Sequence, residues 1–191
     1  SERSLGEGLA ALHAHQAERF GWRINDFIGP TPQANGWCDD WATFWRERRL
    51  RPQLELAVQR GFGRVLEAPG TRLLDAVEAL LGGHRPSPAL LHGDLWAGNW
   101  FTDQDGRPVV FDPAVYYGDR ETDLAMTRLF GGFGPDFYTA YEQAAPLPAG
   151  HELRAELYNL YHVINHANLF GGAYAGQARI VMERLLAATR G

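Results

Sequence analysis

The most constraining feature of the sequence is a pair of short runs that place three polar residues at fixed spacing. Residues 92–99 read His-Gly-Asp-Leu-Trp-Ala-Gly-Asn, and residues 109–114 read Val-Val-Phe-Asp-Pro-Ala. A phosphoryl-transfer site uses one carboxylate to orient and deprotonate a hydroxyl, and further oxygen ligands to hold Mg²⁺ beside the phosphates. We predict that Asp94 is the catalytic base and that Asn99 and Asp112 bind the metal.

Three side chains near these runs have less specific roles. We expect His92 to brace the loop through hydrogen bonds rather than to transfer protons. Asp123, which lies just before an apolar helical stripe, either caps that helix or accepts hydrogen bonds from the loop backbone, and both roles are structural. Trp96 lies between the base and a metal ligand, so its ring is either part of the core or a wall of the acceptor pocket.

The basic residues leave one part of a kinase site unaccounted for. All 18 are arginine, whereas kinases hold the nucleotide phosphates with a lysine near a glycine-rich loop. Gly6–Ala11 mimics a dinucleotide fingerprint but follows no strand. A group of arginines on a predicted helix favours a solvated face over a phosphate site. The group consists of Arg46, Arg48, Arg49 and Arg51.

Length and composition are those of a single-domain globular protein. The chain has 191 residues, 45% of them hydrophobic, and can bury a core. Its net charge of −5 and scattered arginines give no footprint for nucleic acid. Cys38 is the only cysteine, and no apolar stretch approaches the roughly 20 residues of a membrane span. We expect a cytoplasmic protein without nucleic-acid or membrane partners, and from the start at Ser1 we expect that its natural beginning lies upstream.

The spacing of apolar residues predicts a mostly helical chain. Ser4 and Glu7 suggest a cap for the first helix, Asp39 or Asp40 for the second and Thr71 for the third, while residues 28–37 read as a loop. The second helix ends near Gly61. The expected helices cover residues 4–20, 39–61, 71–81, 120–130, 134–144, 150–168 and 174–189.

Between these helices the pattern changes to short apolar runs. Ala89–Leu91 and Arg107–Phe111 read as strands, and Asp103–Gly106 as a turn. We therefore predict an α+β fold, mostly α, in which a small β hairpin carries the catalytic loop.

The motifs resemble those of the fructosamine kinase family. The resemblance is carried by LLHGDLWAGN at 90–99, FDPAVYYGDRETDLAM at 111–126 and LFGGF at 129–133. GPTPQANGW at 29–37 and INHANLFG at 164–171 are similar as well, so the resemblance extends over nearly the whole chain.

The resemblance implies a protein-kinase-like fold related to aminoglycoside phosphotransferases. In that fold, ATP lies between an amino-terminal β lobe and a helical carboxy-terminal lobe, and the sequence resembles the helical lobe only. Members phosphorylate the sugar 3-hydroxyl of ketosamines, free or protein-bound, using ATP and Mg²⁺, which leads to deglycation. The resemblance carries the base role to Asp94 and magnesium binding to Asn99 and Asp112. It suggests substrate contacts for Trp96, Glu121 and His166.

Several alternatives remain open from the sequence. Because no glycine-rich loop or lysine is present, we expect residues 1–191 to be a carboxy-terminal lobe that lacks its ATP-binding β lobe and is inactive alone. The acceptor could instead be an aminoglycoside or another polyol, or the chain could be a non-catalytic sugar- or amine-binding module. His162 and His166 lie four residues apart on one helical face, and a packed pair is favoured over a metal site.

Overall fold

The computed structural model describes residues 1–190, and helices dominate them. The α-helices are α1 (Glu2–His13), α2 (Trp41–Phe44), α3 (Arg51–Ala57), α4 (Gly63–Leu81), α5 (Glu121–Leu129), α6 (Pro135–Ala144), α7 (His151–Phe170) and α8 (Gly172–Ala188). Two π-helical segments, η1 (Trp45–Leu50) and η2 (Val58–Phe62), flank α3, and η3 (Ala97–Asn99) is a 3₁₀ turn. Of the helices in residues 1–190, none combines the length and apolar character that crossing a membrane requires.

The strands form three small antiparallel pairs. β1 (Asp26–Ile28) pairs with β2 (Thr31–Gln33), β3 (Ala89–Leu91) with β6 (Tyr116–Gly118), and β4 (Trp100–Thr102) with β5 (Pro108–Val110). The fold is therefore mostly helical with a few small sheets, as predicted.

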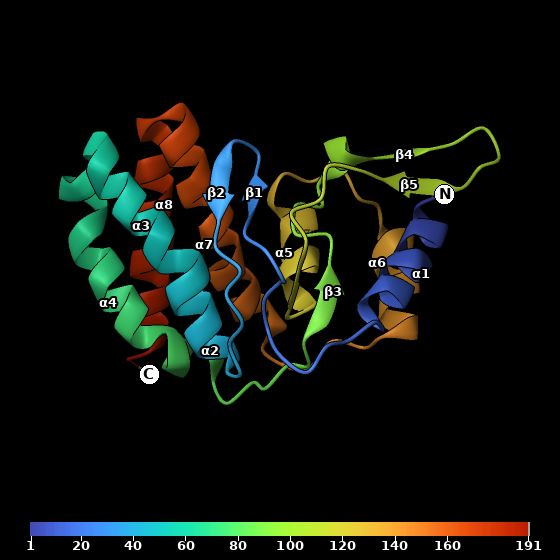
Figure 1. The fold of residues 1–191 in the computed structure, drawn as a ribbon, viewed down its shortest axis with the longest axis horizontal. Helices are drawn as coiled ribbons and strands as arrows, with labels where there is room; N and C mark the ends of the chain where they lie inside the picture. Colours follow the sequence, from blue (N-terminus) through green and yellow to red (C-terminus); the bar gives the residue numbers. More distant parts are fainter. Residues whose placement is uncertain (191) are drawn as a thin grey trace.

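The larger core lies among α2, α4, α7 and α8, which stand side by side in Figure 1. Trp41, Phe44 and Trp45 are buried there, and the Trp41 ring packs against the rings of the other two at 5.6 and 5.5 Å. Helix α7 packs against α8 in this core and also against α5, so α7 connects the larger core to the motif region.

A second, smaller core lies at the other end of the molecule, where α1 packs along α6 (Figure 1). It consists of Leu5, Leu9, Leu95, Leu124, Phe137 and Tyr141. Because Leu95 belongs to the catalytic loop and Leu124 to α5, this core fixes the loop from the side opposite α7.

The helix predictions were correct in the carboxy-terminal half and less so before it. Helix α1 ends at His13 rather than residue 20, and Ser1 caps it instead of Ser4. Thr71 is not a cap, because it lies inside α4 and its hydroxyl donates to the Glu67 carbonyl oxygen at 2.9 Å. Asp40 caps α2 as predicted. Gly61, with φ of 94°, marks the predicted end of the second expected helix, and α4 begins just after it, at Gly63.

The β predictions need two corrections. Residues 28–37, expected to be a loop, include β2 and the end of β1, which form a hairpin. The turn at 103–106 does join two paired strands, but Ala89–Leu91 pairs with Tyr116–Gly118 instead of with the run at 107–111 that follows the turn. The catalytic loop therefore bridges two separate sheets rather than lying on one hairpin.

Candidate active site

The predicted catalytic loop, residues 92–99, connects β3 to β4. Gly93 lies in the left-handed region with φ of 86°, and a Cβ built on it would overlap the Ala114 carbonyl oxygen. The Ala114 N–H donates to the His92 carbonyl oxygen at 2.8 Å. The loop thus crosses the segment after Asp112 in direct contact, which requires glycine at position 93.

Asp123, in the first turn of α5, anchors the backbone of this loop. Its Oδ1 accepts the Gly93 N–H and its Oδ2 accepts the His92 N–H, both at 2.9 Å. Burial opposes ionisation of this carboxyl, but its hydrogen bonds, above all the one from His13 and also the one from the Gly93 N–H, hold its pKa below the usual range. Of the two structural roles predicted for Asp123, the structure shows the backbone anchor.

His92 braces the loop through both ring nitrogens. Its Nε2 lies 2.8 Å from the Phe111 carbonyl oxygen, which can only accept, so Nε2 carries the proton. Nδ1 then accepts the Asp94 N–H at 3.2 Å. The ring therefore ties the base to the residue before Asp112, in agreement with its predicted bracing role.

Asp94 is the half-buried carboxylate at the centre of the site. Burial raises its pKa to about 7, the charges of Asp123 and Asp112 add to this, and the hydrogen bond from Asn99 opposes it. A carboxylate with proton affinity near neutrality is suited to take a proton from a hydroxyl. A cation beside it would lower this pKa and keep the group ionised.

Asn99 and Asp112 offer free oxygen atoms near this carboxylate. The Asn99 Nδ2 donates to the Asp94 carbonyl oxygen at 2.9 Å and lies 3.5 Å from Asp94 Oδ2, which leaves its Oδ1 for a ligand. Asp112 is exposed and has φ of 50°, a conformation that non-glycine residues rarely adopt. The Phe111 N–H donates to the Asn99 carbonyl oxygen at 3.0 Å and keeps the two segments together. This donor set fits Mg²⁺.

A cavity of about 410 Å³ opens beside Asp94. Mostly apolar groups from the β1–β2 turn, the catalytic loop, α5 and α7 line it. Trp96, 40% exposed, forms one wall, and its ring meets that of Phe130 edge-on at 6.4 Å. Of the two alternatives for Trp96, the structure places its ring at the pocket rather than in the core.

His166 lies in the same cavity, on α7. Its Nδ1 is 2.7 Å from the His162 carbonyl oxygen, so Nδ1 donates and Nε2 is left as an acceptor. Its ring packs against Phe130 at 5.0 Å and Phe170 at 5.5 Å. Burial, with a smaller contribution from His166, lowers the pKa of His162 to about 3, so that ring is neutral. Both histidines face the cavity, and neither belongs to a group of three metal-ligating side chains within residues 1–190.

Comparison with known proteins identifies the family of this chain. A family model described as fructosamine kinase matches residues 1–188. The chain belongs to the fructosamine kinase family.

Relatives and solved structures in this family show how much of each protein the chain spans. It is 49% identical over 183 residues to "Probable ketoamine kinase slr1563" of Synechocystis, covering 95% of this chain and 61% of that protein. "Protein-ribulosamine 3-kinase, chloroplastic" of Oryza sativa subsp. indica is 41% identical, with 97% and 54% covered. The chain thus spans about three fifths of the length of the curated relatives it matches.

Two crystal structures of candidate fructosamine-3-kinases superpose closely on this fold. The protein from Haemophilus somnus 129PT gives a TM-score of 0.89 at 30% identity, covering 97% of this chain and 63% of that one. The protein from Thermobifida fusca YX-ER1 gives 0.86 at 38% identity, with 97% and 65% covered.

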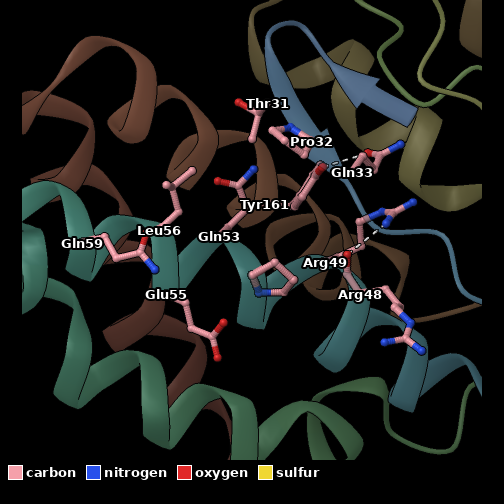
Figure 2. Close-up of a pocket in the computed structure, with 11 residues that line it drawn as sticks. Thr31, Pro32, Gln33, Arg48, Arg49, Gln53, Glu55, Leu56, Gln59 and Tyr161 are labelled. Carbon is pink, nitrogen blue, oxygen red and sulfur yellow. Dashed lines mark hydrogen bonds between the residues drawn. The ribbon is translucent and has the colours of Figure 1, made fainter. Parts of the chain in front are cut away.

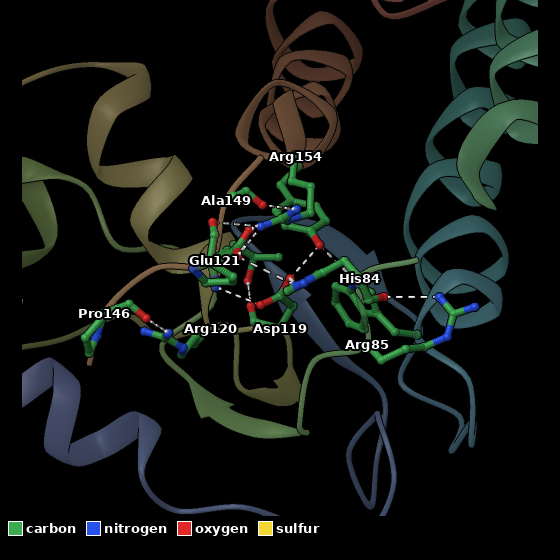
Figure 3. Close-up of polar contacts among 12 residues, drawn as sticks. His84, Arg85, Asp119, Arg120, Glu121, Pro146, Ala149 and Arg154 are labelled. Carbon is green, nitrogen blue, oxygen red and sulfur yellow. Dashed lines mark hydrogen bonds and ion pairs between the residues drawn. The ribbon is translucent and has the colours of Figure 1, made fainter. Parts of the chain in front are cut away.

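One residue that the fructosamine kinase resemblance assigned to the substrate lies elsewhere. Glu121 does not line the cavity beside Asp94. Both of its oxygens accept from Arg154, at 2.7 and 2.9 Å, in a buried ion pair. His84 and Asp119 complete this cluster, and Figure 3 shows its hydrogen bonds converging on the Asp119 carboxylate. Both Glu121 oxygens are therefore engaged with Arg154, away from the cavity beside Asp94 at which the substrate contact was expected.

The arginine group also departs from its predicted solvated face. Arg46 and Arg51 do pair with Glu47, with shortest distances of 3.0 and 2.7 Å. Arg49, however, is fully buried: its guanidinium lies 4.0 Å from the centre of the Tyr116 ring and donates to the Asn35 Oδ1 at 2.8 Å. The sequence pattern missed this because the acceptors lie on the segment after β2.

A second cavity, of about 260 Å³, separates the β1–β2 hairpin from α3 (Figure 2). Gln33 at its edge donates to the Ala114 carbonyl oxygen at 3.2 Å and accepts the Tyr161 hydroxyl at 2.7 Å. Thr31 donates to Asn165 Oδ1 at 2.7 Å. These bonds fix the hairpin between α7 and the Asp112 segment, and so fix the hairpin turn that lines the acceptor cavity.

Sequence reasoning missed two residues, His13 and Tyr141, that support the candidate site through Asp123. His13 lies 2.9 Å from Asp123 Oδ2 and 2.8 Å from the Tyr141 hydroxyl, and both contacts are buried. His13 is 110 residues from Asp123 and 128 residues from Tyr141 in the sequence. No local spacing signals such a contact.

Proposed function

We propose that the protein is an ATP-dependent kinase that phosphorylates the sugar 3-hydroxyl of ketosamines. The observation that carries the proposal is the placement of Asp94, Trp96 and His166 around one cavity, with Asn99 and Asp112 beside the same carboxylate. Membership of the fructosamine kinase family and the names of its relatives support ketosamines as the acceptor class.

In this proposal, Asp94 orients the acceptor hydroxyl and accepts its proton. The hydroxyl oxygen forms a bond to the γ-phosphorus of ATP, while the bond from that phosphorus to the β–γ bridging oxygen breaks and ADP leaves with the electron pair. Because such transition states are loose, the proton moves late, and orientation is the larger contribution of the carboxylate. His92 and Asp123 fix the orientation through the loop backbone.

Magnesium, when bound, would neutralise charge on the phosphates, and Asn99 and Asp112 would hold it. The cavity beside Asp94 accepts the sugar, with the Trp96 ring as a wall and His166 Nε2 as an acceptor for a hydroxyl or ammonium hydrogen. We further propose that a β-rich ATP-binding lobe outside these residues completes the nucleotide site, because the chain has no lysine.

The test is identification of the product. The full-length protein, which includes the proposed ATP-binding lobe and is the parent of every variant below, is incubated with ATP, MgCl₂ and Nε-fructosyl-lysine, and the reaction is followed by ³¹P NMR. We expect a sugar phosphate on the 3-hydroxyl and an equal amount of ADP. Kanamycin and glycerol serve as competing acceptors. Faster phosphorylation of either would move the acceptor class to aminoglycosides or simple polyols, and binding of Nε-fructosyl-lysine without ADP release would indicate a non-catalytic module.

A further inference from the structure

A buried chain of hydrogen bonds connects the α1–α6 pair to the catalytic loop. Arg120 Nη1 donates to the Tyr141 hydroxyl oxygen at 3.0 Å, and that hydroxyl lies 2.8 Å from His13 Nδ1. His13 Nε2 lies 2.9 Å from Asp123 Oδ2, and Asp123 accepts the N–H groups of residues 92–93. This series of hydrogen bonds therefore ends at the backbone N–H groups of the two residues before Asp94.

The donors and acceptors in this series of hydrogen bonds fix the positions of the protons on Tyr141 and His13. Arg120 can only donate, so the Tyr141 oxygen accepts from it and its own hydroxyl proton points to His13 Nδ1. The His13 proton is then on Nε2 and is donated to Asp123. A doubly protonated His13 would leave the Tyr141 hydroxyl proton without its acceptor in a buried position, which is unfavourable. Every polar atom is satisfied only with a neutral His13.

We propose that His13 is a positioning residue of the active site: its Nε2–H orients Asp123, which in turn holds the backbone N–H groups of His92 and Gly93, the two residues before Asp94. The proposal rests on the proposed kinase function for its kinetic consequence, but not for its structural one. Asp123 Oδ2 has two hydrogen-bond partners, His13 and the His92 N–H, so loss of His13 leaves that oxygen with the loop alone.

The environment of Asp123 shows why an apolar replacement of His13 should matter. The titratable and charged groups around it come from six segments: His13 on α1, Tyr141 on α6, Arg120 ahead of α5, His92 and Asp94 on the loop, Tyr116 on β6 and His162 on α7. Without His13, burial would favour the protonated carboxyl. A protonated Asp123 has one oxygen fewer to accept the two loop N–H groups, so the loop would loosen as the pH falls.

Two substitutions separate positioning from packing. In His13→Gln, the side-chain amide can donate to Asp123 through one end and accept from Tyr141 through the other, as the neutral imidazole does. In His13→Leu, the volume is retained but both hydrogen bonds are lost. Positioning predicts that Gln preserves the site better than Leu. Simple packing in a buried position predicts the reverse order, because Leu buries no polar atoms.

The first measurement needs no substrate. Nitrogen-15 NMR of the protein should show His13 as the neutral Nε2–H form, and hydrogen exchange at residues 92–93 should be at least about tenfold faster in His13→Leu than in the parent. His13→Gln should lie near the parent. A doubly protonated or Nδ1–H ring in the parent, or equal exchange in the Leu and Gln variants, would overturn the proposal.

The second measurement is the pH dependence of kcat with ATP, MgCl₂ and Nε-fructosyl-lysine. Leu9→Ala is the control, because Leu9 packs in the same α1–α6 core without joining the hydrogen-bond chain. We expect the acid limb of the profile to move up by about one pH unit or more in His13→Leu only. An equal shift in Leu9→Ala would reduce His13 to a packing role. An inactive parent would refute the proposed kinase function, and the exchange measurement would still decide the role of His13.

Discussion

At the scale of single residues, the site combines one carboxylate of raised proton affinity with two free oxygen ligands. Asp94 reaches this state because burial outweighs the hydrogen bond from Asn99. Asp112 is held in a left-handed conformation by neighbours on both sides, since Phe111 bonds to His92 and to Asn99 while Ala114 bonds to His92. Conformations of this kind cost about 1–3 kcal/mol and persist at functional sites.

Removal of either metal ligand should weaken magnesium binding. In Asn99→Ala and Asp112→Ala we expect the half-saturating Mg²⁺ concentration to rise about tenfold or more, since each loses an oxygen ligand to a hard cation. Titration of the protein with Mn²⁺ by electron paramagnetic resonance measures this without turnover. Asp105→Ala, which removes an exposed acid from the β4–β5 turn, is the matched control. Parent-like binding in both ligand variants would contradict the assignment.

Replacement of the wall of the acceptor cavity should affect one substrate only. Trp96→Ala is expected to raise the KM for Nε-fructosyl-lysine about tenfold, because a large aromatic contact with the sugar is lost, and to leave the KM for ATP unchanged. Trp37→Ala is the control, since Trp37 is 38% exposed against 40% for Trp96 but does not line the cavity. Equal changes in both KM values would place Trp96 outside acceptor binding.

At the scale of elements, the catalytic loop depends on close contact between two connections rather than on one hairpin. Residues 92–99 leave β3 and cross the segment between Asp112 and β6, and Asp123 on α5 holds the crossing. The prediction of a single hairpin failed because β3 pairs with a strand more than 20 residues away, at Ala89↔Gly118, which no local pattern reveals.

The crossing predicts an asymmetry between two glycines with similar φ. Gly93→Ala should destabilise the protein by more than the roughly 1–3 kcal/mol of a left-handed alanine, because its Cβ would also overlap the Ala114 carbonyl oxygen. Gly106→Ala, with φ of 77° and open space around its Cβ, should cost only the backbone strain. Urea unfolding measures both. Equal losses would contradict the tight crossing.

The buried pair behind α5 predicts a loss of stability without a change in substrate affinity. Glu121→Gln leaves Arg154 buried without its counter-charge, and such losses amount to about 3–5 kcal/mol. Glu156→Gln, in an exposed pair with Arg184, should cost about 0–1 kcal/mol. We expect an unchanged KM for Nε-fructosyl-lysine in both variants. A selective rise of that KM in Glu121→Gln, with stability retained, would restore the substrate role that the resemblance suggested.

At the scale of the whole molecule, the site lies where two cores meet. The larger core carries α7 with His166, and the smaller one carries α1, α6 and the anchor of the loop. The helices after residue 119 were predictable because their apolar spacing and glycine stops are local. The assembly of His13, Tyr141 and Asp123 was not, because sequence periodicity says which face of a helix is buried but not which helix covers it.

The polar residues follow the same contrast between features set by local sequence and contacts that depend on packing. That Asp94, Asn99 and Asp112 lie close together could be predicted, because the chemistry requires those residue types at short spacing; their roles stay predictions. The buried ion pair of Glu121 and the burial of Arg49 could not, since each depends on partners brought together by packing.

The central claim is that Asp94 serves a phosphoryl transfer to a ketosamine hydroxyl. The most direct test compares Nε-fructosyl-lysine-dependent ADP release by the parent and by Asp94→Asn at saturating ATP and MgCl₂, with thermal unfolding as the check on folding. Loss of a positioned acid–base group lowers rates by about 10² to 10⁴. We predict a loss in this range with the fold intact, and parent-like turnover by Asp94→Asn would contradict the account.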